Sequence, residues 1–204
     1  MTPLQLIRTV AWGFLVLVVA ASGALFYMWN RGDFQSANVL APQAAVGGEF
    51  TLVDTKGKTV TQKSLKGKIS VLFFGYTFCP DVCPTTLTEA EGWLKELGPK
   101  AQEIEVYFIS VDPDRDTQEV LAEYMEAFDP RFNALTGSKE QVKGVIKAYR
   151  VFAKKFFDTE GDYTVSHTAS VYLLDRDARF AGTIAYQEKH ATAMAKLKRL
   201  IADG

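Results

Sequence analysis

Hydrophobic and polar positions divide the chain into one long uncharged stretch and a region of alternating short apolar runs and amphipathic stretches. Residues 9–30 carry no charged side chain. As a helix they would reach about 33 Å, enough to cross a hydrocarbon core of about 30 Å. Trp12 lies near one end, and Tyr27 and Trp29 lie near the other, as an interfacial aromatic belt requires. The pattern predicts a single transmembrane anchor over residues 9–30.

A cleaved signal peptide is the competing interpretation of this stretch, with Ser22 and Ala24 as small residues at the cleavage site. The apolar run continues through residues 25–29, beyond such a cut, which favours an uncleaved anchor. Either interpretation predicts that the following domain is exported.

Charges beside the anchor predict its orientation. Arg8 precedes the stretch, whereas Arg31 on the other side is close to Asp33, so the positive-inside rule favours a cytoplasmic tail over residues 1–8. An Arg- and Ser-rich presequence is missing from the sequence, which favours a bacterial inner membrane over an organelle. We therefore expect a single-pass protein with a periplasmic C-terminal domain.

After a small, polar linker over residues 31–48, the pattern predicts one α/β domain over residues 49–204. Near-continuous apolar runs are typical of strands buried on both faces, and alternating strands and helices predict one mixed sheet flanked by helices. Strands are expected at 50–53, 59–61, 69–74, 106–111, 150–157, 169–174 and 179–186. A helix that opens at the cysteines is expected to end at Leu97, and further helices are expected at about 117–128, 138–149 and 190–202.

Composition limits the classes of function. With 48% hydrophobic residues the chain can bury a full core, which excludes a disordered protein. Its 23 basic and 24 acidic side chains give a net charge of −1, which disfavours a dedicated nucleic-acid binder. Two cysteines exclude a disulfide framework and a four-thiolate zinc site.

Candidate chemistry centres on Cys79 and Cys83, which follow a predicted buried strand and open a predicted helix. A spacing of four puts both sulfurs on one helical face, and the positive end of the helix dipole favours thiolate over thiol. The pair is therefore expected to be redox-active or metal-binding. A structural disulfide is the alternative, but a bridge that closes so short a loop would constrain little of the unfolded chain.

Other polar groups carry weaker signals. His167 lies on the predicted loop before strand 169–174, and His190 at the start of the last helix is expected to be an exposed structural residue. Asp116 and Glu119 fit a capping box for helix 117–128. The acidic side chains of Asp112, Asp114, Asp116 and Glu123 have the spacing of a calcium loop, but Thr117 stands where that loop needs glycine, which disfavours calcium.

Three blocks of sequence resemble the Sco/SenC family of copper-binding assembly proteins. Residues 75–87 (GYTFCPDVCPTTL) resemble its signature, residues 111–117 (VDPDRDT) its second block, and residues 165–168 (VSHT) its histidine block. The blocks occur in the family's order, and the match spans about residues 45–203.

The resemblance implies a thioredoxin-like fold with an inserted hairpin and a copper site formed by Cys79, Cys83 and His167. One position departs from the family, because many members have Asp where this chain has Ser166. Any role of that carboxylate in the site is therefore not carried over.

Two related classes fit less well. A thioredoxin-type reductase usually has its cysteines one residue closer together and a proline ahead of the facing strand, where this chain has Thr168 and Ala169. A peroxiredoxin needs Thr or Ser three residues before its reactive cysteine, whereas Tyr76 precedes Cys79 by three.

Two thiolates and an imidazole form a soft ligand set that suits Cu(I) and tolerates Cu(II), whereas structural zinc would need a fourth ligand. We therefore expect one copper ion per chain and a metallochaperone for the dinuclear copper centre of cytochrome c oxidase. Expected partners are the copper-centre subunit of the oxidase and another periplasmic copper chaperone or thiol reductant. The alternatives are a thiol–disulfide oxidoreductase acting through the two cysteines and a copper or redox sensor.

Overall fold

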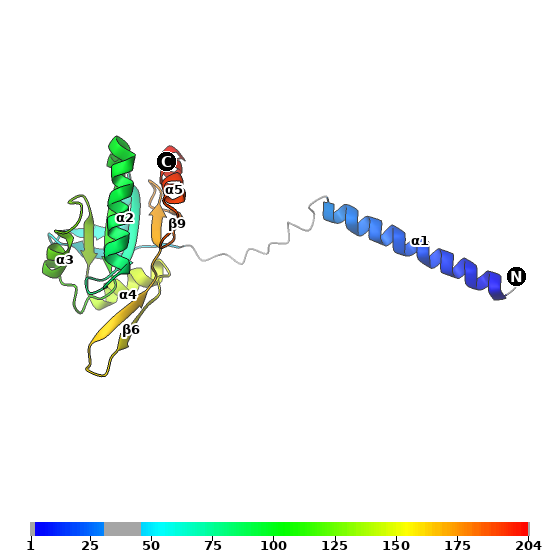
Figure 1. The fold of residues 1–204 in the computed structure, drawn as a ribbon, viewed down its shortest axis with the longest axis horizontal. Coiled ribbons are helices and arrows are strands. Elements are labelled where there is room, and N and C mark those ends of the chain that lie inside the picture. Colours follow the sequence, from blue (N-terminus) through cyan, green and yellow to red (C-terminus); the bar gives the residue numbers. More distant parts are fainter. Residues whose placement is uncertain (1–2, 31–45, 204) are drawn as a thin grey trace. The chain divides into compact units, whose positions relative to one another are not determined.

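The computed structural model describes residues 3–30 and 46–203 (Figure 1). By its internal contacts the chain divides into two units, residues 1–44 and residues 45–204.

The first unit contains helix α1 (Pro3–Asn30), which includes the whole uncharged stretch 9–30. Its described side chains are those of Gln5, residues 12–24, Phe26 and Tyr27. Among the described residues, no helix is both long and apolar enough to span a membrane. Residues 31–45 of the predicted linker lie outside the described residues.

The second unit is an α/β domain built on one mixed sheet. Its strands are β1 (Thr51–Asp54), β2 (Thr59–Thr61), β3 (Ile69–Gly75), β4 (Ile104–Ser110), β5 (Asn133–Thr136), β6 (Ala153–Phe157), β7 (Tyr163–His167), β8 (Val171–Leu174) and β9 (Phe180–Ile184). Its helices are α2 (Val82–Leu97), α3 (Gln118–Met125), α4 (Lys139–Ala148) and α5 (His190–Asp203), with short 3₁₀ turns η2 (Gln62–Leu65) and η3 (Gly98–Glu103).

Seven strands form the main sheet in the order β2-β1-β5-β4-β3-β8-β9. Strand β4 pairs in parallel with β3 and with β5, and the other neighbours pair antiparallel, so the sheet is mixed as the sequence predicts. Strands β6 and β7 form a separate antiparallel hairpin that projects from the domain (Figure 1).

Strand β3 is buried along its whole length because helices cover both faces of the sheet. Its Val71 and Phe73 belong to the core under α2 and α5, and the alternate residues Leu72 and Phe74 belong to the core under α4. This two-sided burial explains the continuous apolar run at residues 69–74. The carboxyl end of β3 leads directly to the cysteine loop and fixes where that loop starts.

Two local expectations are wrong. Thr117, not Asp116, is the N-cap of α3: the Thr117 Oγ1 accepts a hydrogen bond from the Val120 amide at 3.3 Å. The Asp116 carboxylate is fully buried and points into the domain instead. His167 is also placed differently, as the last residue of strand β7 rather than on a loop.

Gly75, the last residue of β3, lies against helix α2. A Cβ atom at this position would stand 2.7 Å from the Sγ of Cys83 and 2.6 Å from the Phe108 ring, closer than side-chain atoms approach. Both neighbours are fully buried, so neither has room to move aside. The absence of a side chain at Gly75 therefore sets the distance between the strand and the buried cysteine.

We predict that Gly75→Ala lowers the free energy of unfolding by about 1–3 kcal/mol, because it overpacks this contact. The matched control is Gly92→Ala in α2, where an added Cβ meets nothing within 4 Å. That control should be neutral or stabilising by about 0.5–1 kcal/mol through helix propensity. Urea unfolding of both variants measures the difference, and equal stabilities would contradict the close approach.

Candidate metal centre

Cys79 and Cys83 lie where strand β3 ends and helix α2 begins. Cys79 is in the connecting loop and half-buried, whereas Cys83 is the second residue of α2 and fully buried. The Cys83 amide, one of the unpaired N–H groups of the helix terminus, donates to the Cys79 Sγ at 3.4 Å. The predicted juxtaposition of the two sulfurs is confirmed.

His167 comes to the same place from strand β7. Its Nε2 lies 3.5 Å from the Sγ of Cys83. Its Nδ1 lies 3.1 Å from the carbonyl oxygen of Thr168, which can only accept, so the hydrogen bond places a proton on Nδ1. The Nε2 lone pair is then directed at the sulfurs, in the orientation that a metal-ligating imidazole needs.

Aromatic rings hold the imidazole in this position. The Tyr76 ring stands edge-on to it at a centroid distance of 5.7 Å, and Phe73 does so at 6.1 Å. Tyr76 also contacts the strand that carries the histidine, because its hydroxyl oxygen accepts from the Val165 amide at 3.2 Å. The His167 ring is therefore packed against residues at the carboxyl end of β3.

The two thiols have opposite acid strengths. A hydrogen bond from Cys83 is the largest effect on Cys79, and together with bonds from backbone amides it lowers the pKa of Cys79 to about 4. The same hydrogen bond, together with burial, raises the pKa of Cys83 far above that of an ordinary thiol. Near neutral pH the metal-free pair therefore holds one proton, with the thiolate on Cys79.

Cys79, Cys83 and His167 each offer one ligand atom, and these atoms lie within 4.8 Å of one another. Across the described residues no second cluster of three His, Cys, Asp or Glu side chains has this geometry. Two sulfurs and one nitrogen so placed can bind a soft metal ion, and the two sulfurs alone can form a redox dithiol.

The three aspartates of the acidic loop after β4 pair with side chains of the domain. Asp112 pairs with Arg115, Asp114 with Lys139, and Asp116 with the hydroxyl groups of Thr77 and Ser110. His190 is exposed and bonds Glu96 of α2 at 2.6 Å, so its predicted structural role is confirmed.

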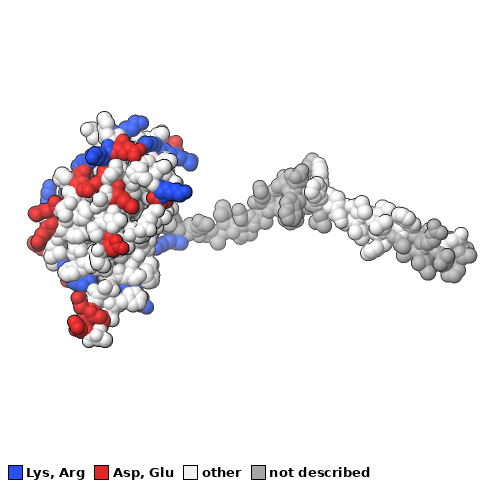
Figure 2. All heavy atoms as spheres, viewed as in Figure 1, with Lys and Arg blue, Asp and Glu red and all other residues white. Residues whose placement is uncertain are grey.

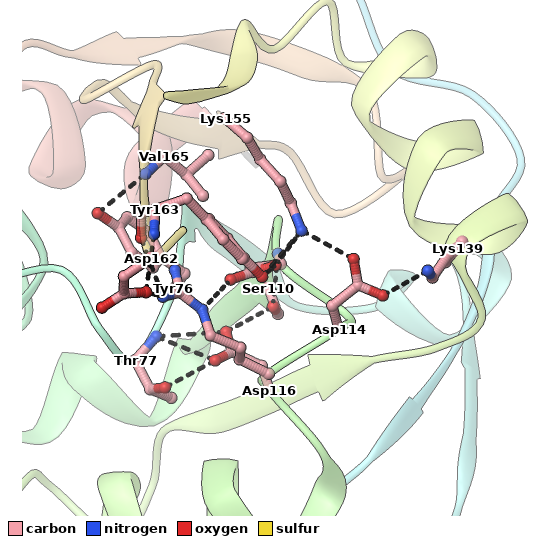
Figure 3. Close-up of polar contacts among 12 residues, drawn as sticks. Tyr76, Thr77, Ser110, Asp114, Asp116, Lys139, Lys155, Asp162, Tyr163 and Val165 are labelled. Atoms are coloured by element: carbon pink, nitrogen blue, oxygen red, sulfur yellow. Dashed lines mark hydrogen bonds and ion pairs between the residues drawn. The ribbon is translucent and has the colours of Figure 1, made fainter. Parts of the chain in front are cut away.

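Sequence reasoning missed the polar network around this loop (Figure 3). Arg115 donates to Asp112 at 2.7 Å and to the Tyr163 carbonyl at 2.9 Å, and its guanidinium lies 4.5 Å from the Phe78 ring centroid. Lys155 of β6 also pairs with Asp112. The acidic and basic residues at 112–116 indicate that this loop forms ion pairs. The pattern does not reveal their partners Lys155 and Tyr163, which are distant in the sequence.

Together the fold and the site define a class of protein: a thioredoxin-like α/β domain with two cysteines at the opening of a helix and a histidine brought to them by a hairpin. The sequence profile of SCO1/SenC matches residues 38–202, most of the chain. The chain belongs to the SCO1/SenC family.

Curated relatives come from mitochondria and bacteria. Mitochondrial protein SCO2 of Saccharomyces cerevisiae is 39% identical over 168 residues, which are 81% of this chain and 56% of that protein. A SCO2-like protein of Rickettsia felis is 36% identical over 145 residues, or 70% of this chain and 71% of the relative. The matches cover 56% of yeast SCO2 and 42% of the Arabidopsis thaliana SCO1 homolog 1, about half the length of these mitochondrial relatives.

Solved structures share the fold. Copper-bound ScoI of Bradyrhizobium japonicum is 48% identical with a TM-score of 0.71, covering 76% of this chain and 99% of that one. Copper-bound Arabidopsis thaliana ScoI is 34% identical with a TM-score of 0.73, covering 78% of this chain and all of that one (100%). BsSco, 23% identical, is described as a member of the Sco family of cytochrome c oxidase assembly proteins. The copper-bound structures show that this family includes members that bind copper.

The unequal thiols generate a prediction. In reduced, metal-free protein the thiolate absorbance of Cys79 should persist as the pH is lowered and disappear only near its pKa of about 4. Cys83→Ser keeps a hydrogen-bond donor, whereas Cys83→Ala removes it, so the pKa of Cys79 should be higher in the alanine variant. Ultraviolet titration of the three proteins measures this order. Identical midpoints in the two variants would contradict proton sharing between the sulfurs.

Proposed function

We propose that this protein is a copper metallochaperone that delivers copper to the dinuclear copper site of cytochrome c oxidase during its assembly. The observation that carries the proposal is the convergence of Cys79, Cys83 and His167 within 4.8 Å. Membership of the SCO1/SenC family and the copper-bound relatives from Bradyrhizobium and Arabidopsis support it. One copper ion per chain is the stoichiometry that three ligands imply.

The ligand set suits delivery better than storage. Three protein ligands leave a copper ion open to an incoming thiolate, and Cys79 is half-buried, so a partner sulfur can approach from its side. The low pKa of Cys79 keeps that sulfur ionised and ready to bind near neutral pH. Transfer then proceeds by exchange of thiolates, with the copper centre of the oxidase subunit as the acceptor.

A second function is favoured by the same thiol pair. A thiolate on Cys79 beside a protonated Cys83 is the arrangement that attacks a partner disulfide and then resolves the mixed disulfide. A thiol–disulfide oxidoreductase that reduces the cysteines of the oxidase subunit is therefore the alternative. In that reaction the partner's disulfide is reduced while Cys79 and Cys83 are oxidised to a disulfide.

We further propose that α1 anchors the domain to a bacterial inner membrane, with residues 1–8 cytoplasmic and the copper-binding domain periplasmic. The uncharged stretch 9–30 and the basic Arg8 before it support this topology. Alkaline phosphatase fused after Gly204 should be active, and a reporter that works only in the cytoplasm should be inactive. The reverse pattern would contradict the localisation.

His167 separates metal delivery from disulfide exchange. Loss of one of three ligands leaves a two-sulfur site that Cu(I) tolerates and Cu(II) does not. His167→Ala should therefore abolish the Cu(II)–thiolate charge-transfer absorption and weaken Cu(I) binding, while the Cys79–Cys83 disulfide still forms. Cys79→Ser and Cys83→Ser should lose both properties. An anaerobic Cu(I) titration against a chelator and a Cu(II) absorption titration measure these effects.

The matched control is His190→Ala, because His190 lies on α5, pairs with Glu96 and is not one of the three proposed ligands. That variant should bind copper like the wild type. In cells, His167→Ala should lower oxidase activity, and added copper should restore part of it. Normal oxidase with His167→Ala, together with failure of either cysteine variant, would favour the reductase over the chaperone.

A further inference from the structure

The hairpin that carries His167 has little apolar attachment to the domain. Val165 is the one fully buried side chain in its two strands, β6 and β7. Its tip carries the exposed acidic residues Asp158, Glu160 and Asp162. Figure 2 shows acidic side chains gathered at the lower end of the domain, where Figure 1 places the hairpin. Polar contacts must therefore hold the hairpin, and the histidine with it, against the domain.

Three successive inward positions of β7 have three different partners. Tyr163 donates its hydroxyl hydrogen to the Asp112 carboxylate at 2.8 Å, Val165 donates its amide hydrogen to Tyr76, and His167 meets the cysteines. Alternate side chains of a strand face the same side, so the side chains of Tyr163, Val165 and His167 share the face of β7 that ends at the metal ligand. The contact with Asp112 is thus four residues from His167 along a single strand face.

Lys155 completes this attachment from the neighbouring strand, where it is paired in register with Val165. Its Nζ lies 3.0 Å from Asp112, 2.8 Å from Asp114 and 2.9 Å from the Tyr163 hydroxyl (Figure 3). The Asp112 side chain is wholly inaccessible to solvent, so its charge is balanced by Lys155 on one oxygen and Arg115 on the other. A buried carboxylate holds such partners strongly.

The same loop also holds the segment before the cysteines. Asp116 accepts from the Thr77 hydroxyl at 2.6 Å and from the Thr77 amide at 3.2 Å, two residues before Cys79. The loop at residues 112–116 therefore contacts both ligand-bearing segments, the cysteine loop through Asp116 and the histidine hairpin through Asp112. Figure 3 shows the contact between Asp116 and Thr77. The two carboxylates of the loop together set the gap between sulfur and imidazole.

We propose that Lys155 is a positioning residue for the metal centre: its ion pair with Asp112 holds the hairpin so that His167 stays within bonding reach of the two sulfurs. The proposal rests on the copper-binding function proposed above. Without the pair, the contacts of β7 with Asp112, Tyr76 and Arg115 hold the hairpin less firmly. The centre then loses its imidazole more readily than its thiolates. Cu(II), which needs the imidazole, should be affected more than Cu(I).

Lys154 provides a matched control on the same strand. It is exposed on the opposite face of the hairpin, where its register partner is the neutral Ser166. Its ammonium group lies 5.2 Å from the Phe156 ring centroid, and among the described residues no carboxylate pairs with it. Lys154→Met and Lys155→Met thus remove the same charge from adjacent positions, but only the second removes a contact to Asp112.

The test is a Cu(II) titration of the full chain in detergent, followed by the thiolate charge-transfer absorption and electron paramagnetic resonance. Lys155→Met should bind Cu(II) about 10–100-fold more weakly, as loss of a group that orients a ligand does, and its spectrum should lose the imidazole contribution. Lys155→Arg should restore most of the affinity because it keeps the charge. Lys154→Met should match the wild type.

Tyr163→Phe gives a second route should Lys155→Met not fold, since it removes one hydroxyl and keeps the ring. It should weaken Cu(II) binding in the same direction by a smaller factor, with the Cys79–Cys83 disulfide still forming. Equal Cu(II) affinities in Lys155→Met and Lys154→Met, or wild-type binding by Tyr163→Phe, would overturn the positioning role of Lys155. Either result would leave the proposed copper function standing. A wild-type chain without charge-transfer absorption would overturn the proposed copper function and this role with it.

Discussion

The buried carboxylate of Asp112 must be neutralised, and the cations that neutralise it come from its own loop and from the hairpin that carries His167. Removing a charge from water costs several kcal/mol unless partners replace the solvent. Loss of Arg115 or Lys155 from Asp112 would therefore destabilise the domain. The need to neutralise Asp112 ties the hairpin to the end of strand β4. The cysteine loop and α2 follow the neighbouring parallel strand β3. The three ligands therefore meet at the carboxyl ends of the central strands β3 and β4.

Within the centre, packing and electrostatics impose a second constraint. Gly75 lets the buried sulfur of Cys83 lie directly against the strand, out of water. The hydrogen bond between the two sulfurs, together with burial, keeps the Cys83 sulfur protonated, and the same bond keeps Cys79 ionised. A metal ion that binds both sulfurs displaces the remaining proton, so capture and release of the metal are coupled to proton transfer. Cys79 is half-buried, so exchange of thiolate ligands with a partner begins at this residue.

Much of the domain follows from local pattern. The apolar run at residues 69–74 and the cysteine spacing predict the central strand and the adjoining sulfurs, because both depend on neighbours in sequence. The predicted cap of α3 is wrong because Asp116 and Thr117 are both good capping residues, and the hydroxyl groups of Thr77 and Ser110 hold Asp116 inside the domain. His167 as a ligand came from the family resemblance. Nothing near Lys155 in sequence reveals its partner, which lies over 40 residues away.

X-ray absorption of the copper-loaded full chain tests the three-ligand centre most directly, because it counts the atoms bound to copper without relying on activity. Two sulfur scatterers and one imidazole nitrogen are expected in the wild type, and only the nitrogen should disappear in His167→Ala. A copper shell of nitrogen and oxygen alone, or a wild-type spectrum unchanged by His167→Ala, would contradict the centre formed by Cys79, Cys83 and His167.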